Sequence, residues 1–193
     1  IPMLTRAQLL GQIMRNYDTP IAVSGTHGKT TTTSMISQIL LEADADPTIS
    51  VGGILPSIGG NIRVGQSETF VTEACEYTNS FLSFFPKISV ILNIDADHLD
   101  FFKDIDDIRH SFRRFAQLLP ADGALIINAD TLHYQDIIKD LSCKIITYGL
   151  EHEAQYQATD ITYDKYGHAS FTVLKDGRKA GSFYLKVPGS HNV

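Results

Sequence analysis

Residues 21–31, Ile21-Ala22-Val23-Ser24-Gly25-Thr26-His27-Gly28-Lys29-Thr30-Thr31, decide the fold of this chain. A short apolar run, typical of a buried strand, stops at Gly25. Lys29 and four successive threonines then open a segment with helical spacing. Glycines let backbone N–H groups converge on phosphate oxygens, and a helix N-terminus adds a favourable dipole. The stretch therefore predicts a loop that binds nucleotide phosphates.

This loop departs from the general pattern G-x-x-x-x-G-K-[ST], because Val23 stands where the pattern has its first glycine. The loop is the shorter G-T-H-G-K-T, which begins at Gly25. We expect Lys29 to neutralise the outer phosphates and the hydroxyl of Thr30 or Thr31 to ligate Mg²⁺. The alternative is a glycine-rich turn before an ordinary helix with one exposed lysine. Nucleotide binding is favoured because strand, turn, Lys-Thr and helix follow in the required order.

Composition limits the class of protein. The 193 residues can bury a full core, and the apolar fraction of 43% is that of an ordinary globular protein. The sequence has no apolar run near the ~20 residues that span a bilayer, and no signal-peptide pattern. Two cysteines without metal-type spacing favour a reduced, cytoplasmic setting. The net charge of −6 argues against general nucleic-acid binding.

Both ends of the sequence indicate a piece of a longer protein. The chain starts at Ile1 without a methionine, and residues 188–192 are typical of the entry to another helix. We expect residues 1–19 to form a lead-in with an amphipathic helix over 5–16. Residues 20–193 are expected to form one domain.

Strands and helices are predicted to alternate after the loop, which indicates a doubly wound α/β fold with a mostly parallel sheet. From about residue 154 the pattern changes to short alternating segments, which predict a small antiparallel sheet over 154–187 appended to the core. Glycines in 51–54 predict a stretch flexible enough to approach a ligand closely. The predicted strands are 20–24, 70–72, 88–94, 124–127, 144–148, 156–163, 168–174 and 182–187, with helices at 30–42 and about 105–119.

Polar side chains are expected at the carboxyl ends of the parallel strands, where open sheets bind ligands. Glu73 ends one predicted strand and His98 follows another. Because Mg²⁺ prefers oxygen ligands, Glu73 and a threonine hydroxyl suit one ion, and Glu76 is a weaker candidate. His98 would place a second ion or an acceptor carboxylate. The alternatives are a surface carboxylate at Glu73 and a loop histidine held by Asp97 and Asp100.

Four motifs together resemble the Mur ligase family: G-T-H-G-K-T-T-T-T at 25–33, E-A-C-E at 73–76, N-I-D-A-D-H-L-D at 93–100 and P-G-S-H-N at 188–192. The resemblance covers nearly the whole chain. It implies that 20–193 is the central ATP-binding domain, and that the family's N-terminal UDP-binding domain and its C-terminal domain are missing here.

The resemblance also implies an activity. The motif set is similar to family members that ligate L-alanine to UDP-N-acetylmuramate with ATP and Mg²⁺, through an acyl phosphate, in peptidoglycan precursor synthesis. Two alternatives stay open: a recycling ligase that joins a tripeptide to UDP-N-acetylmuramate, and a non-catalytic nucleotide-binding switch. The isolated chain is expected to be inactive, because such ligases bring their substrates together between three domains.

Residue roles follow from the same resemblance. It implies catalytic roles for Lys29, Glu73 and His98, with His98 beside a second metal. Cys75 and Tyr77 depart from the common E-A-D-E-S pattern, and the carbamylated lysine of sibling ligases has no counterpart here. The expected metal ligands are Thr30, Thr31, Glu73 and His98. The expected nucleotide contacts are Gly25, Thr26, His27, Gly28, Lys29, Thr30, Thr31, Asn93 (from the strand end), and His191 and Asn192 (at adenine).

Overall fold

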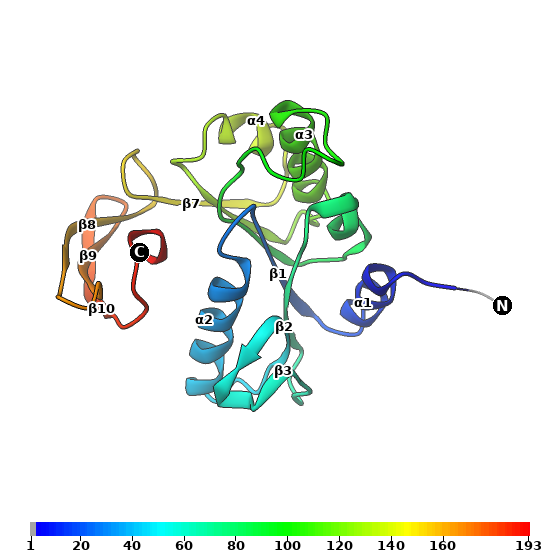
Figure 1. The fold of residues 1–193 in the computed structure, drawn as a ribbon, viewed down its shortest axis with the longest axis horizontal. Helices are drawn as coiled ribbons and strands as arrows, with labels where there is room; N and C mark the ends of the chain where they lie inside the picture. The colour runs from blue at the N-terminus through cyan, green and yellow to red at the C-terminus, as the bar shows by residue number, and fades with distance from the viewer. Residues whose placement is uncertain (1–2) are drawn as a thin grey trace.

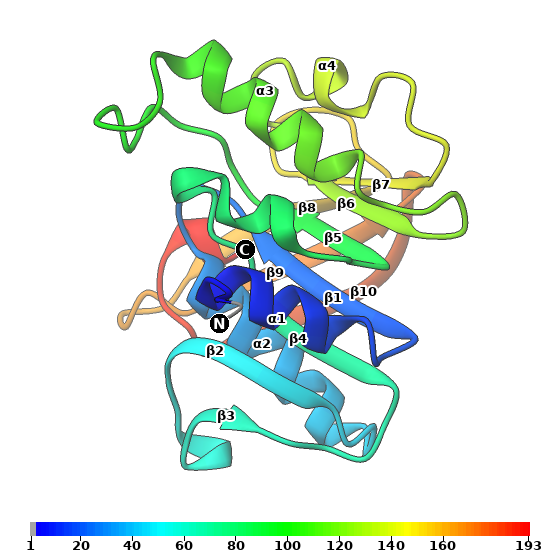
Figure 2. The ribbon, with the colours of Figure 1, turned by 90° about the vertical axis from the view of Figure 1, so that its right-hand side faces the viewer.

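The predicted strand–loop–helix unit forms the centre of the fold. In the computed structural model, which describes residues 3–193, β1 (Thr19–Ser24) is an inner strand of a ten-stranded sheet. α2 (Lys29–Glu42) begins directly after the loop. α2 lies on one side of β1 and α1 (Arg6–Met14) on the other (Figures 1 and 2). The doubly wound α/β fold predicted from the sequence is thereby confirmed.

The strand order explains where ligands can bind. The order is β10-β9-β8-β7-β6-β5-β1-β4-β2-β3, and β2, β4, β1, β5, β6 and β7 are parallel. The carboxyl ends of these strands therefore meet at one edge. The remaining strands are β2 (Thr48–Leu55), β3 (Gly60–Arg63), β4 (Thr69–Glu73), β5 (Ile88–Ile91), β6 (Ala124–Asn128), β7 (Lys144–Gly149), β8 (Tyr156–Tyr163), β9 (Ala169–Lys175) and β10 (Arg178–Leu185).

The main apolar core lies on one face of the sheet, under α1 and the helices that follow β4, β5 and β6. It joins side chains such as Met14, Phe70, Ile91 and Leu125. A smaller cluster around Ile49 packs against α2 on the other side. The covering helices are α1, α3 (Ile105–Ala116), α4 (Tyr134–Ile138) and the 3₁₀ segment η2 (Tyr77–Ser83), while η1 (Pro56–Ile58) and η3 (Ser190–Asn192) are single turns.

The C-terminal strands are antiparallel, as predicted for 154–187, and they continue the main sheet. β8 pairs in parallel with β7 through Tyr148↔Tyr156 and Gly149↔Gln157. β9 and β10 then add antiparallel strands beyond it. Figure 1 shows these strands at the far end of β7, with the C-terminal segment between them and α2.

Two other segments differ from the sequence-based expectation. The stretch 51–54 lies inside β2, which pairs with β4 and β3. The apolar run 88–94 leaves the sheet after Ile91, because its last residues turn towards the phosphate loop.

The helical spacing of the apolar residues at 35–36 and 39–40 predicts that these residues form the buried face of α2, and this prediction is wrong in part. Thr33 and Ser37 are fully buried, whereas Ile39 is 67% exposed. Small side chains let the helix backbone approach the sheet closely, and the Ser37 hydroxyl donates to the carbonyl of Thr33 at 2.7 Å. Within residues 3–193, no helix has both the length and the apolar character needed to span a membrane.

An aromatic cluster fixes η2 on the core. The Phe81 ring stacks on Phe115 with 4.6 Å between centroids, and it meets Phe112 edge-on at 5.4 Å. All three side chains are fully buried. Because η2 follows directly after Glu76, this cluster also positions the polar residues at the end of β4.

We predict that Phe81→Ala lowers the free energy of unfolding by roughly 3–5 kcal/mol, the usual range for a buried phenylalanine. Urea unfolding followed by circular dichroism measures it. Phe85→Ala is the matched control: Phe85 is 45% exposed and lies under the Arg15 guanidinium, so its loss should cost less than about 1 kcal/mol. Equal losses in both variants would contradict this account of η2.

Candidate functional site

The phosphate loop depends on two glycines in conformations that other residues avoid. Gly25 has a φ of 146°, and a Cβ there would lie 2.9 Å from the Cβ of Leu92. Gly28 has a φ of 82° and precedes α2 without a side-chain cap. The first N–H groups of α2 therefore have no side-chain partner at the N-cap and are available to an anion.

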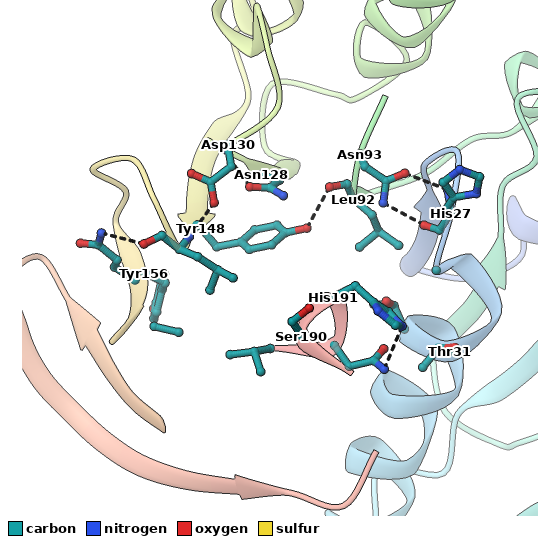
Figure 3. Close-up of a pocket in the computed structure, with 18 of the residues that line it drawn as sticks. His27, Thr31, Leu92, Asn93, Asn128, Asp130, Tyr148, Tyr156, Ser190 and His191 are labelled. Carbon is teal, nitrogen blue, oxygen red and sulfur yellow. Dashed lines mark hydrogen bonds between the residues drawn. The ribbon is translucent and has the colours of Figure 1, made fainter. Parts of the chain in front are cut away.

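The end of β5 holds this loop in place (Figure 3). The Asn93 side chain accepts a hydrogen bond from the His27 N–H at 2.7 Å and donates to the His27 carbonyl at 3.0 Å. The buried Thr26 hydroxyl accepts from the Asp95 N–H at 2.9 Å. Asn93 is thus occupied with the loop backbone, as expected for a residue that supports the site from the strand end.

A cavity of about 700 Å³ opens beside the loop (Figure 3). Its walls come from the loop and the first turn of α2, the ends of β6 and β7, the faces of β8 and β9, and η3. This volume is typical of a site for a small organic ligand. The polar groups that line it include His27, Thr31, Asn128, Tyr148, His191 and Asn192. Several predicted nucleotide contacts therefore line one cavity: His27, Gly28, Thr31, Asn93, His191 and Asn192. The other predicted contacts do not line it: Gly25, Thr26, Lys29 and Thr30.

Asp130 shapes the far wall of this cavity. Its carboxylate accepts hydrogen bonds from the backbone N–H groups of Leu150 at 2.6 Å and His152 at 2.8 Å. Burial alone would raise the pKa of Asp130, but these hydrogen bonds outweigh it and lower the pKa. Beside it, burial and the Asp130 charge raise the pKa of Tyr148, so that its hydroxyl stays protonated.

Lys29 is the first residue of α2 and is not among the residues that line this cavity. Its ammonium donates to the carbonyls of Gly25 at 2.6 Å and Thr26 at 3.1 Å, and it pairs with Glu76 at 3.0 Å. The Glu76 side chain is only 2% exposed. The His98 imidazole lies 3.7 Å from the same carboxylate. The structure thus brings together two predicted catalytic residues around Glu76, which the sequence marked only as a weak candidate.

Glu73 ends β4 and lies against the glycines of β2. Its carboxylate accepts a hydrogen bond from the Gly52 N–H, and a Cβ at Gly52 would lie 2.8 Å from that carboxylate. A Cβ on Gly53 would lie 3.2 Å from the Thr30 methyl group. Thr30 and Glu73 therefore flank the same backbone, whereas Thr31 lines the large cavity. The glycines in 51–54 serve close approach to these two side chains.

A metal ion at Glu73 would also need ligands that are neither carboxylates nor imidazoles, such as hydroxyl, phosphate or water oxygens. Among residues 3–193, no group of three or more His, Cys, Asp and Glu side chains is arranged to hold one. Mg²⁺ takes one or two carboxylates together with substrate phosphates and water. A second cavity of about 270 Å³, lined by Glu73, Cys75, Tyr77 and Arg6, adjoins the Glu73 carboxylate.

Sequence reasoning did not identify the cavity residues Asn128, Asp130 and Tyr148. A signal was present for Asn128, because it directly follows the apolar run 124–127 and ends its strand. Asp130 and Tyr148 carry no such signal, since their roles arise from contacts across β6 and β7.

Comparison with known proteins identifies relatives over the whole chain. The family described as Mur ligase middle domain matches residues 23–193. The UDP-N-acetylmuramate–L-alanine ligase of Agathobacter rectalis is 63% identical over 193 residues, which are 100% of this chain and 42% of that protein. The chain thus spans less than half the length of the curated relatives that it matches.

Solved structures agree with the fold. The UDP-N-acetylmuramate:L-alanyl-γ-D-glutamyl-meso-diaminopimelate ligase (MPL) of Neisseria meningitides has a TM-score of 0.87 at 30% identity, and the match covers 100% of this chain and 63% of that one. The UDP-N-acetylmuramate–alanine ligase MurC of Thermotoga maritima has a TM-score of 0.80 at 27% identity, with 94% and 40% covered.

We predict that Asn93→Ala weakens binding of ATP to the phosphate loop about tenfold, because two hydrogen bonds to the loop backbone are lost. Titration with a fluorescent ATP analogue measures the affinity. Hydrogen exchange should also rise at His27 and Gly28. Asn61→Ala, an exposed amide in β3, should change neither. Unchanged exchange in the loop would contradict the role of Asn93.

A second prediction concerns acid stability. Because its pKa is lowered, Asp130 stabilises the folded state above the ordinary aspartate pKa, and this contribution is lost as the pH falls below about 4. Asp130→Asn should therefore cost roughly 1–3 kcal/mol at pH 7, and the difference from wild type should shrink towards pH 3. Chemical unfolding across this pH range tests it. Asp18→Asn, at an exposed position, is the control, and a gap independent of pH would refute the prediction.

Proposed function

The chain belongs to the Mur ligase family, and on that premise we propose that it is the ATP-binding domain of a ligase that joins L-alanine to UDP-N-acetylmuramate. One observation carries the proposal. The phosphate loop adjoins both a nucleotide-sized cavity and the charged group formed by Lys29, Glu76 and His98, so that an outer phosphate on the loop would lie near these charges.

ATP would occupy the cavity of about 700 Å³. The phosphates would lie on the N–H groups at the start of α2, and adenine would lie towards His191 and Asn192, which line the same cavity. In the structure the Asn192 amide donates to the Pro188 carbonyl at 2.7 Å, which orients the turn that carries it. Thr31 lines this cavity and would contact phosphate or ribose.

Thr30 and Glu73 would hold Mg²⁺ together with phosphate oxygens, because Thr30 lies in the first turn of α2 directly after the loop and Glu73 ends the neighbouring strand β4. When bound, the ion supplies positive charge to the outer phosphates. His98 would lie near the transferred phosphoryl group or a second ion, since it faces Glu76 beside Lys29.

The reaction then places clear demands on these residues. A carboxylate oxygen of the acceptor attacks the γ-phosphorus, the bond to ADP breaks, and an acyl phosphate forms. The amino group of L-alanine attacks the acyl carbon, loses a proton, and inorganic phosphate leaves. The first step brings two anions together and the second releases phosphate, so the chain must neutralise charge and orient groups. Lys29 would neutralise the transferred phosphoryl group, and Asn93 would keep the loop in register.

The L-alanine reaction is favoured over the tripeptide reaction by sequence. The relatives named for L-alanine ligation are 53–63% identical over the full chain, whereas the solved tripeptide ligase is 30% identical. The tripeptide ligase remains the second candidate, because its backbone has the higher TM-score of the two solved relatives, 0.87 against 0.80.

Residues 1–19 would act as the lead-in, and 20–193 as the central domain of a three-domain enzyme. The additional length of the relatives, of which this chain covers 42%, supports this organisation. The UDP-sugar and the amino acid would be held mainly by the other two domains. Both cysteines are free, in keeping with a cytoplasmic enzyme.

The test is phosphate release by the full-length protein with ATP, Mg²⁺ and UDP-N-acetylmuramate, supplied with either L-alanine or the preformed tripeptide. We expect phosphate release when L-alanine is the acceptor and none when the tripeptide is. This turnover should be lost when Mg²⁺ is chelated and in the Lys29→Ala variant. Turnover with the tripeptide alone would replace the proposal by the second candidate. ATP binding without turnover on either acceptor would favour a nucleotide switch.

A further inference from the structure

Glu76 is a buried carboxylate for which the proposed reaction has no role. Its side chain is 2% exposed, and it lies at the start of η2 between Lys29 and His98. Taking a carboxylate out of water is unfavourable unless it is paired and hydrogen-bonded. Its ammonium partner is Lys29, which contacts both carboxylate oxygens, at 3.0 and 3.2 Å.

The contacts of Lys29 use the full donor capacity of its ammonium group. A lysine ammonium has three N–H donors. Here they meet the carbonyls of Gly25 and Thr26 and the carboxylate of Glu76. The large cavity is lined by His27, Gly28 and Thr31 but not by Lys29. In this structure the ammonium group of Lys29 is therefore held by protein oxygens, and Lys29 is not among the residues that line the cavity.

We propose that Glu76 is a positioning residue that holds Lys29 while no nucleotide is bound, and that the outer phosphate of a nucleotide draws Lys29 away from it. The inference rests on the proposed function, because it assumes a nucleotide triphosphate on the loop. Phosphate and carboxylate compete for the same ammonium group, so the strength of the Lys29–Glu76 pair sets part of the nucleotide affinity. The pair links residues 47 positions apart, the loop and the end of β4.

Competition for Lys29 and simple removal of a nearby negative charge lead to different predictions for the Glu76→Gln variant. Removing any negative charge near the loop would favour phosphate binding through space, whether or not Lys29 is present. If Glu76 acts by holding Lys29, its removal matters only while Lys29 is there. A double-mutant cycle separates the two cases.

The experiment measures binding of Mg²⁺ with a non-hydrolysable ATP analogue to the full-length protein by calorimetry, in wild type, Glu76→Gln, Lys29→Met and the double variant. We expect Glu76→Gln to tighten binding about tenfold when Lys29 is present and to change it less than about twofold in the Lys29→Met background. Glu68→Gln, at an exposed carboxylate, is the matched control and should leave the affinity unchanged.

Two results would overturn the inference: equal effects of Glu76→Gln in both backgrounds, or weaker binding in Glu76→Gln. Failure of wild type to bind the analogue at all would overturn the ATP site and this inference together. Binding without coupling between the two residues would overturn the inference alone.

A second measurement does not depend on Lys29→Met, which leaves Glu76 buried without its ammonium partner and is open to misfolding. Nitrogen-15 labelling of lysine detects ammonium groups that exchange slowly with water. We expect a signal from Lys29, assigned by its loss in Lys29→Arg, that disappears in Glu76→Gln and shifts when the analogue binds. A Lys29 signal that is the same in Glu76→Gln, or that ignores the analogue, would contradict the proposal.

Discussion

Two hydrogen bonds between the Asn93 side chain and the His27 backbone hold the phosphate loop on the end of β5, and the rest of the site depends on them. They fix the direction in which the chain enters α2. Gly28 and Thr31 then line the large cavity, while the ammonium group of Lys29 pairs with Glu76. One local constraint thus positions both a wall of the cavity and the ion pair beside it.

The parts of this site that depend on residues adjacent in the sequence could be predicted from the sequence. The apolar run ending at Gly25 predicts β1, and the following Lys-Thr segment predicts the start of α2, because both patterns are local. Glu73 was accessible for a similar reason, since a polar residue that ends a parallel strand must lie at the ligand-binding edge.

The parts that depend on contacts between segments far apart in the sequence could not be predicted. Glu76 meets Lys29 across 47 residues, and no pattern in either segment specifies the other. The prediction of the inner face of α2 from its apolar residues was also wrong in part. Thr33 and Ser37 are buried there because small side chains allow the helix to approach the sheet, and a scale of apolar character does not report size. Gly52 was taken as a sign of flexibility, whereas it leaves room for the Glu73 carboxylate.

Charge balance explains why a site of this kind would bind nucleotide together with a metal ion. Lys29 and Glu76 form a pair of opposite charges, so the empty loop offers an anion mainly backbone dipoles. A nucleoside triphosphate brings several negative charges, more than Lys29 alone can offset. A divalent cation beside Thr30 and Glu73 would supply the missing positive charge and leave Lys29 to exchange carboxylate for phosphate. Under the proposed function, metal dependence and the burial of Glu76 would both follow from placing a single lysine at an anion site.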